Sequence, residues 1–190
     1  MPGTEPAGVR EGVRDKERTR RGILDAAARL VAAEGGGVSI AEVAAAAGVS
    51  KSGLLHHFPG REALLLALVE DAAERLWTEV RALVDLAENR PGKLLRAYVR
   101  ALTDGGHTVA QVFAPTGLTA AVGTLPGSEE FMARDAQMWR EAFAADGMDP
   151  ARSIVVQHAA EGLAASAGSP YLTDVELAAA RAHLLELAEP

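Results

Sequence analysis

The chain has 190 residues, a formal net charge of −7 and 48% hydrophobic residues, but only 4% of its residues are aromatic. It contains no cysteine, which excludes disulfides, thiol nucleophiles and thiolate metal sites. Residues 1–22 lack the apolar centre of a signal peptide, and no apolar run approaches the length of a membrane span. We therefore expect a soluble, cytoplasmic protein. A core built mainly from Ala, Leu and Val favours helices, and we predict an all-α fold of about nine to ten helices.

The charge is divided unevenly along the chain. Residues 1–61 hold nine Lys/Arg and seven Asp/Glu, a balance of +2, whereas residues 62–190 hold ten and nineteen, a balance of −9. A basic N-terminal segment favours contacts with DNA phosphates, although a merely solvated charged tail has the same composition. Residues 1–13, rich in Gly, Pro and charge, are predicted to form a disordered tail. The positive charges are concentrated in Arg10, Arg14, Lys16, Arg18, Arg20 and Arg21.

A capping box opens the first of two short helices predicted between residues 39 and 58. Ser39 and Glu42 have the S-x-x-E spacing in which the serine oxygen and the carboxylate accept the free N–H groups of a helix N-terminus. Ile40 and Val43 then begin an apolar face with helical spacing. Gly48 can end this helix because it adopts the left-handed conformation without a Cβ clash.

The second short helix, about Lys51–His57, follows directly after the turn. Ser50 is its predicted N-cap, and Leu54 and Phe58, four residues apart, are its predicted anchors in the core. Two short helices joined by a tight turn are typical of a helix-turn-helix, which places its second helix in the DNA major groove. An ordinary helical hairpin with no DNA role is the alternative.

The flanking segments carry a resemblance to a known family. Residues 18–35 form a basic-ended amphipathic helix, and the sequence F-P-G-R-E-A-L-L at 58–65 opens a long helix. The order of helix, Gly-rich break, I-A-x-V-A, A-G-V-S-K, L-x-x-H-F-P and R-E-A-L-L resembles the N-terminal domain of the TetR family of one-component regulators. The resemblance covers residues 18–66, about a quarter of the chain. It implies a DNA-binding domain followed by a helical ligand-binding and dimerisation domain.

The resemblance also implies roles for individual residues. The second helix would lie in the major groove, Ser39 would contact a phosphate, and Arg61 stands where the family usually has a phosphate-contacting lysine. Ser52 and Leu55 depart from the family, which commonly has glycine and tyrosine there, and His56 is a candidate to replace the tyrosine's phosphate contact. The predicted DNA-binding residues are Ser39, Ser50, Lys51, Ser52, Gly53, Leu55, His56, His57 and Arg61.

Helices separated by Gly and Pro fill the rest of the chain. The periodicity predicts a long helix over 61–88 that links both domains, then helices over 92–104, 128–145, 150–167 and 174–187, with two short ones within 107–123. Asp149 before Pro150, and a second capping box at Thr173 and Glu176, are clear helix starts. The predicted domains are a tail over 1–13, a helix-turn-helix domain over 14–60, and an effector-binding and dimerisation domain over 61–190.

The helices over 128–145 and 151–167 are the candidate dimer interface. The helix over 151–167 carries a stripe of mostly small residues that lets a partner helix pack closely. The helix over 128–145 adds bulky apolar side chains beside it. The resemblance implies this use of the two penultimate large helices, and an internal core pair is the alternative. The predicted interface residues are Phe131, Met132, Trp139, Val155, Ala159, Gly162 and Ser166.

The resemblance further implies an effector cavity among the middle helices, where a small molecule changes the spacing of the DNA-reading helices. Few charges fall on these helices, which favours a mainly apolar ligand. Apolar walls with a few polar groups are typical of such cavities, although each candidate residue is equally compatible with core or surface. The candidates are Trp77, Tyr98, His107, Gln111, Phe113, Trp139, Phe143 and His158.

These features predict a homodimeric transcriptional repressor that a small-molecule effector releases from a double-stranded DNA operator. The alternative is a small-molecule-binding helical dimer without sequence-specific DNA binding. No nucleophile is paired with a base, and the glycines at 35–37 lack the lysine of a phosphate-binding loop. His158 and Glu161 have metal-ligand spacing but form only one element of a metal-binding bundle. We therefore expect no enzymatic activity, no catalytic residue, no metal and no cofactor.

Overall fold

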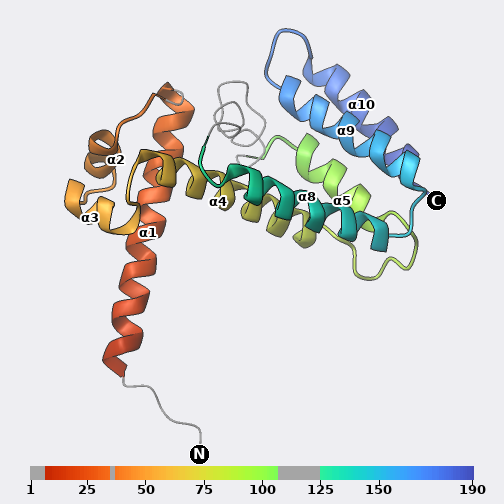
Figure 1. Ribbon diagram of the computed structural model, residues 1–190. Coiled ribbons are helices and arrows are strands. Elements are labelled where there is room, and N and C mark those ends of the chain that lie inside the picture. The colour runs from red at the N-terminus through yellow and green to blue at the C-terminus, as the bar shows by residue number, and fades with distance from the viewer. Residues whose placement is uncertain (1–6, 35–36, 107–124) are drawn as a thin grey trace, which may run out of the picture.

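The computed structural model describes residues 7–34, 37–106 and 125–190, and these ranges contain eight helices and no strand (Figure 1). The all-α prediction is confirmed, and the two short helices predicted within 107–123 lie outside the described residues. Among the described helices, none combines the length and the apolar character needed to cross a membrane. The helices are α1 (Ala7–Glu34), α2 (Ile40–Ala46), α3 (Lys51–His57), α4 (Arg61–Ala82), α5 (Lys93–Thr103), α8 (Ser128–Ala145), α9 (Pro150–Ser166) and α10 (Asp174–Leu187).

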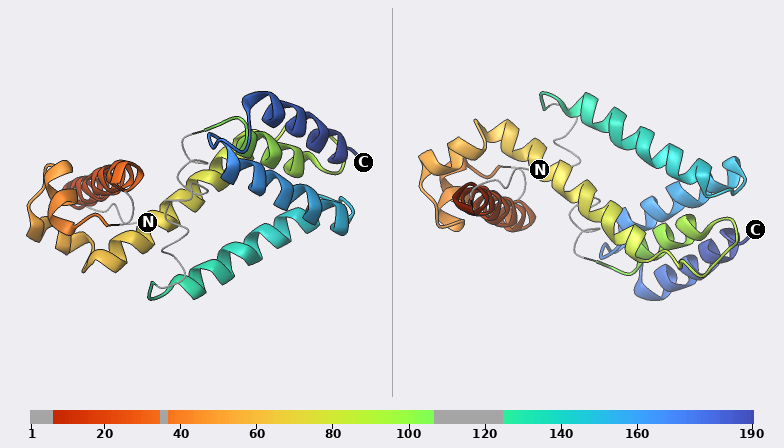
Figure 2. Two further views of the ribbon diagram at one scale, coloured as in Figure 1. Left: turned by 90° about the horizontal axis from the view of Figure 1, so that it is seen from above. Right: turned by 90° about the horizontal axis from the view of Figure 1, so that it is seen from below.

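The smaller of two hydrophobic cores joins α1, α2 and α3 to the first turns of α4 (Figures 1 and 2). Ile23 of α1 and the predicted anchor Leu54 of α3 have no exposed surface, and the second anchor, Phe58, is 2% exposed. Burying side chains of this size contributes about 1.5–3 kcal/mol each. The amphipathic pattern of the sequence therefore places the correct faces of α1 and α3 in this core.

The larger core surrounds α5, whose Leu95, Ala97 and Val99 are completely buried. Helix α5 packs against the second half of α4 on one side and against α9 and α10 on the other. Helix α8 lies at the edge of this bundle, where it runs alongside α4 and contacts both α4 and α5 (Figure 2). Two of its aromatic side chains, Trp139 and Phe143, point into the core.

Helix α4 contributes to both cores but is shorter than the predicted helix over 61–88. It ends at Ala82, and Leu83 is its C-cap. Beyond it, the Asp85 carboxylate accepts the N–H of Ala87 at 2.9 Å, and the Asp85 carbonyl accepts the N–H of Glu88 at 3.2 Å. A side chain that binds nearby backbone in this way offers it an alternative to the helix, which accounts for the early end.

Helix α1 begins at Ala7, so the predicted tail over residues 1–13 is wrong for residues 7–13, which are helical. The sequence contains no proline between Pro6 and Pro59. Nothing in this stretch therefore removes a backbone N–H from the helix or blocks its extension toward the N-terminus. The N-terminal half of α1 projects well beyond α2 and α3 (Figure 1).

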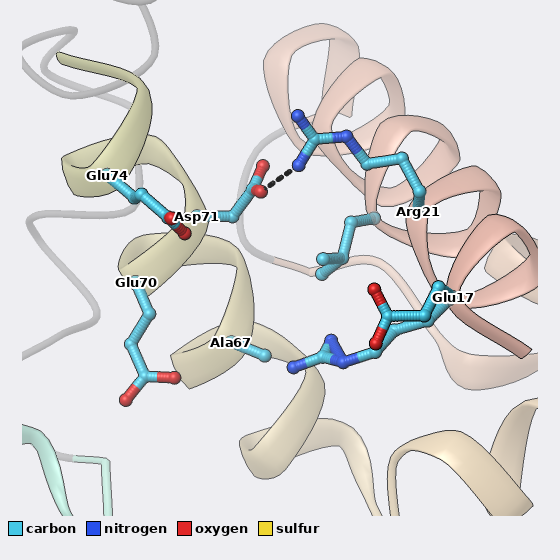
Figure 3. A pocket seen from close by; sticks show the side chains of 8 residues that line it. Glu17, Arg21, Ala67, Glu70, Asp71 and Glu74 are labelled. Carbon is cyan, nitrogen blue, oxygen red and sulfur yellow. Dashed lines mark hydrogen bonds and ion pairs between the residues drawn. The ribbon is translucent and has the colours of Figure 1, made fainter. Parts of the chain in front are cut away.

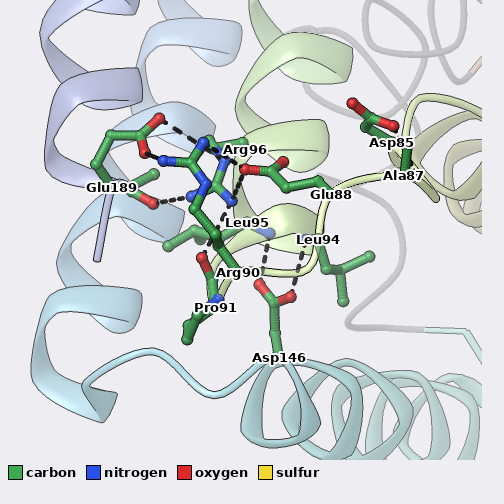
Figure 4. A network of polar contacts seen from close by, with 11 residues as sticks. Asp85, Ala87, Glu88, Arg90, Pro91, Leu94, Leu95, Arg96, Asp146 and Glu189 are labelled. Carbon is green, nitrogen blue, oxygen red and sulfur yellow. Dashed lines mark hydrogen bonds and ion pairs between the residues drawn. The ribbon is translucent and has the colours of Figure 1, made fainter.

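A buried arginine joins the loop after α4 to the end of α10 (Figure 4). Arg96 is 2% exposed, and its Nη2 donates to Glu88 Oε1 at 2.7 Å and to the Pro91 carbonyl at 3.0 Å. Its Nη1 donates to the carbonyl of Ala188. These bonds offset the cost of burying the guanidinium, and the bond to Ala188 joins α5 to a segment distant in sequence.

A remote carboxylate caps the N-terminus of α5 beside this arginine (Figure 4). The Asp146 oxygens accept the N–H groups of Leu94 and Leu95, each at 3.0 Å. The preceding Gly92 has φ of 86°, and a Cβ there would lie 2.6 Å from the Ala188 carbonyl oxygen. Only glycine fits this position, because any other residue would be strained in conformation and would displace the backbone of α10's end.

Replacing Arg96 by methionine should lower the free energy of unfolding by about 3 kcal/mol, because removing one partner of a buried ion pair leaves the other uncompensated. Arg90 Nη2 still lies 2.6 Å from Glu88 Oε1, which places the loss at the lower end of the usual range. Urea denaturation followed by circular dichroism measures the change. Lys93→Met on the same helix is the control, with a change within about 0.5 kcal/mol. An Arg96→Met loss no larger than the control's would contradict the stabilising role of this network.

Candidate nucleic-acid interface and ligand cavity

Both capping motifs predicted between residues 39 and 58 are present. The Ser39 N–H donates to Glu42 Oε2 at 2.8 Å, and the Glu42 N–H donates to Ser39 Oγ at 3.3 Å. Gly48 ends the turn of α2 with φ of 68°, in the left-handed region. Ser50 Oγ then accepts the N–H of Gly53 at 3.0 Å and begins α3. Helix α2, the turn and α3 have the order and bounds of the predicted helix-turn-helix.

Helix α3 buries one side and presents the other outward. Its core side carries the anchors Leu54 and Phe58. Leu55 is 38% exposed on the outer side. Among the other residues predicted to read DNA, Lys51, Ser52 and His56 are exposed, and Gly53 and His57 are half-buried.

The predicted phosphate-contacting residues Ser39 and Arg61 are held near each other at the start of α2. Arg61 Nε donates to the Val38 carbonyl at 3.0 Å, which keeps its side chain beside the N-terminus of α2. The Ser39 N–H is used by Glu42, so the Ser39 hydroxyl is the donor left for a phosphate. Hydrogen bonds from the Ser39 side chain and backbone lower the pKa of Glu42, which keeps a negative charge at this helix end.

Two cations of α1 lie close to α3, and sequence reasoning treated them only as part of a basic segment. The Arg20 guanidinium carbon lies 4.6 Å from the centre of the Phe58 ring, a cation–π contact. Burial first, and then the electrostatic effects of His56, Lys16 and Arg20, lower the pKa of His57. The buried Nδ1 of His57 has no hydrogen-bond partner among the described residues. Arg20 therefore adds positive charge beside α3, and the electrostatic effect of Lys16 on His57 has the same sign.

Other charged residues of α1 are engaged within the protein. Arg21 points across a pocket of about 310 Å³ and pairs with Asp71 of α4 (Figure 3). Arg75 of α4 lies 2.8 Å from Asp71 and 2.6 Å from Asp25 of α1. This network ties α1 to the middle of α4.

Four of the eight predicted effector residues form one aromatic cluster in the larger core. The Trp139 ring centre lies 4.8 Å from that of Trp77, 5.0 Å from that of Tyr98 and 5.5 Å from that of Phe143. His158 lies outside the cluster and is exposed. Such edge-to-face and stacked rings stabilise a core beyond their buried area. Three further predicted residues, His107, Gln111 and Phe113, lie outside the described residues.

A cavity of about 530 Å³ opens beside this cluster, between α4, α5, α8 and α9. We call it the α8/α9 cavity. Its wall includes the charged side chains of Asp135, Arg140 and Glu161, which sequence reasoning did not place there. The predicted residues that line it are Tyr98, Trp139 and His158.

The residues predicted for the dimer interface divide into an outer set and one inner residue. Val155 is 61% and Met132 is 41% exposed, and a Cβ added at Gly162 would meet nothing within 4 Å. Trp139 is only 9% exposed because it packs against α4 and α5, so its assignment to the outer face is wrong. Sequence reasoning missed Ile154, which is 56% exposed next to Val155. The remaining predicted residues, Phe131, Ala159 and Ser166, are half-buried.

Comparison with protein families agrees with this geometry. A family described as bacterial regulatory proteins of the tetR family matches residues 23–68, and a tetracyclin repressor-like C-terminal domain matches residues 92–189. The fold and the helix-turn-helix thus define a DNA-binding, ligand-responsive transcriptional regulator. The chain belongs to the TetR family. No curated protein matches the sequence.

Solved structures share this fold over most of their length. A transcriptional regulator from Rhodococcus sp. Rha1 is 20% identical, with coverage of 89% of this chain and 95% of that chain and a TM-score of 0.72. A TetR family member from Streptomyces coelicolor A3 is 26% identical, with coverage of 90% and 98% and a TM-score of 0.65. The multidrug binding protein EbrR complexed with ethidium is 25% identical, with coverage of 89% and 97% and a TM-score of 0.62.

The lowered pKa of His57 predicts that stability falls on acidification. Because the folded state binds a proton at His57 less readily than the unfolded state, this residue's contribution is complete above its ordinary value of 6.5 and is lost as the pH falls below it. His57→Gln should therefore lose less stability than the wild type between pH 8 and about pH 5. Urea denaturation at several pH values measures the slope. Equal slopes in the two proteins would contradict the lowered pKa of His57.

Proposed function

We propose that this regulator is a homodimeric repressor, which a small-molecule effector releases from a double-stranded DNA operator. The observation that carries the DNA-binding part is the outward face of α3, beside which Arg20 of α1 lies over the Phe58 ring. On this proposal residues 14–60 form the DNA-binding domain, and residues 61–190 form the effector-binding and dimerisation domain. The first turns of α4 support the DNA-binding domain, because they complete its core.

The roles within the interface follow from exposure and chemistry. Lys51, Ser52 and His56, exposed on α3, face the major groove, with Gly53, Leu55 and His57 beside them. The Ser39 hydroxyl and the Arg61 guanidinium contact phosphates at the N-terminus of α2. Ser50 fixes the start of α3 and presents its hydroxyl, 3.1 Å from that of Ser52, at the same edge.

The dimer forms through the outer faces of α8 and α9. Ile154, Val155 and Met132 supply exposed apolar area, and Gly162 and Ala159 let a partner helix approach closely. A two-fold axis through this contact sets the distance between the two α3 helices, which must match successive turns of the major groove.

The effector binds among the helices of the larger core, and the α8/α9 cavity is our candidate for its site. Its size and its mixture of aromatic and polar walls fit a small organic ligand. EbrR, which is similar over 89% of this chain, is a multidrug binding protein whose structure holds ethidium. On this proposal the protein acts by binding rather than catalysis, and it works in the cytoplasm, where its operator lies.

The alternative function is a ligand-binding helical dimer that does not read a DNA sequence. Leu55 favours it, because an apolar side chain stands where the family commonly has a phosphate-contacting tyrosine. A gel shift with the DNA that flanks the coding region distinguishes the two functions. Specific retardation supports the repressor, and equal binding to unrelated DNA supports the alternative.

Lys51→Ala should weaken binding to every DNA sequence and should lower the salt dependence of log K by about 0.9, the value for one lost phosphate contact. Fluorescence anisotropy at several salt concentrations measures both quantities. Lys93→Ala, at the start of α5 and outside the interface, is the control and should change neither. His57→Ala should instead reduce the ratio of the affinity for the specific DNA to the affinity for unrelated DNA. If neither variant differs from the control, α3 is not the reading helix.

Val155→Glu should dissociate the dimer, because a two-fold interface places the new charge on both subunits in an apolar contact, which costs several kcal/mol. Light scattering after size exclusion should give about twice the 19.8 kDa chain mass for the wild type and the chain mass for the variant. Val175→Glu, at an 80% exposed site on α10, is the matched control and should stay dimeric. A wild-type monomer at micromolar concentration would contradict the proposed dimer.

A further inference from the structure

The α8/α9 cavity contains a carboxylate that nothing in the described part of the chain neutralises. Asp135 of α8 lines the cavity and is half-buried, and no hydrogen-bond or ion-pair partner of its carboxylate is found among the described residues. Burial raises the pKa of Asp135. A desolvated carboxylate without a partner is costly, and a cation bound in the cavity would compensate it.

A second carboxylate from the opposite helix is fixed in position by three donors. Glu161 of α9 accepts a hydrogen bond from the Tyr98 hydroxyl at 2.8 Å and from Gln157 Nε2 at 3.1 Å. His158 Nδ1 lies 2.8 Å from the other Glu161 oxygen. Burial first, and then the negative charges of Glu161 and Asp135, raise the pKa of Tyr98 well above its ordinary value. Glu161 is thus held against the Tyr98 hydroxyl, and it lines the same cavity as Asp135.

The aromatic wall of the cavity lies on the same side of α8 as Asp135. Trp139 follows Asp135 by four residues, so the two side chains share one face of the helix. Tyr98 lies at 5.0 Å from Trp139 between ring centres, and both rings line the cavity. Tryptophan and tyrosine faces attract cations, and their rings offer contact area to a flat apolar ligand.

The positive group on the wall does not neutralise the two carboxylates. Arg140 is exposed, and its Nη2 donates to Gln137 Oε1, 3.1 Å away on its own helix. His158 also has 66% of its side chain exposed. The better buried part of the wall thus combines two carboxylates with two aromatic rings, and the positive charge lies at its exposed edge.

We propose that the α8/α9 cavity binds an aromatic organic cation, with Asp135 as the counter-charge and with Trp139 and Tyr98 as ring contacts. The anchored Glu161 adds to the negative potential. This assignment rests on the proposed effector function, and it names the chemical class of the ligand. It also replaces the mainly apolar ligand expected from the sequence with one that is apolar in its rings and positive in its charge.

Three probes that share one tricyclic ring but differ in charge test this assignment on the full chain without DNA. They are 10-methylacridinium, its neutral parent acridine at pH 8, and acridine-9-carboxylate. The chain has two tryptophans, Trp77 and Trp139, and both lie in the aromatic cluster, so quenching of their fluorescence reports binding at this cavity. Calorimetric titration gives the affinities. We expect the cation to bind at least about tenfold more tightly than acridine, and the anion to bind most weakly.

Asp135→Asn keeps the size of the side chain and removes its charge. It should weaken binding of the cation about tenfold and leave binding of acridine unchanged, a difference that a purely structural role would not produce. Glu130→Gln, an exposed site on the same helix, is the control and should leave all three affinities unchanged. The assignment is overturned if acridine or the anion binds as tightly as the cation. It is also overturned if Asp135→Asn weakens acridine and the cation equally.

Operator release is measured separately, with tetraphenylphosphonium, an aromatic cation that does not intercalate in DNA. If the cations bind in an Asp135-dependent way but do not release the operator, the proposed effector control is wrong and the ligand assignment stands. If a neutral or anionic compound releases the operator and Asp135→Asn has no effect, the ligand assignment is wrong and the effector control stands.

Discussion

Both halves of the molecule depend on α4, because one continuous helix contributes side chains to both cores. Leu64 and Leu68 complete the core of the helix-turn-helix, and Leu76 and Val80 belong to the larger core. Its 22 residues include no proline or glycine and span about 33 Å. An uninterrupted helix of this length resists a sharp kink. A displacement of one end of α4 is therefore transmitted to the other end, and with it to α3.

The same two turns of α4 contact both α1 and the α8/α9 cavity. Asp71 and Arg75 pair with residues of α1, while Ala73 and Leu76 line the cavity. On the proposed function, a ligand that favours one position of α4 changes the free energy of the ion pairs on its other side. This coupling requires only that the ligand binds the two positions of α4 with different affinities, because a ligand with equal affinity would shift nothing.

Local signals predicted the fold better than they predicted the sites. The capping boxes at Ser39 and Thr173, and the start of α9 at Asp149, depend on neighbours three residues away, and the structure contains all three. The environments of Arg96 and Asp135 depend instead on helices distant in sequence, so no spacing rule could identify either residue. Trp139 shows the same limit, since an apolar helix position does not reveal whether it faces the core or a partner.

The proposed dimer face and the α8/α9 cavity share α9, which links oligomerisation to ligand binding. Ile154 lines the cavity and is also 56% exposed, and the adjacent Val155 is 61% exposed. A partner subunit that covers this face would also cover Ile154 and so narrow the mouth of the cavity. On the proposed function, a ligand that displaces α9 would therefore also disturb the dimer contact. Because the dimer contact sets the distance between the two α3 helices, such a displacement is a second route, besides α4, by which occupancy of the cavity would oppose the fit to two turns of DNA.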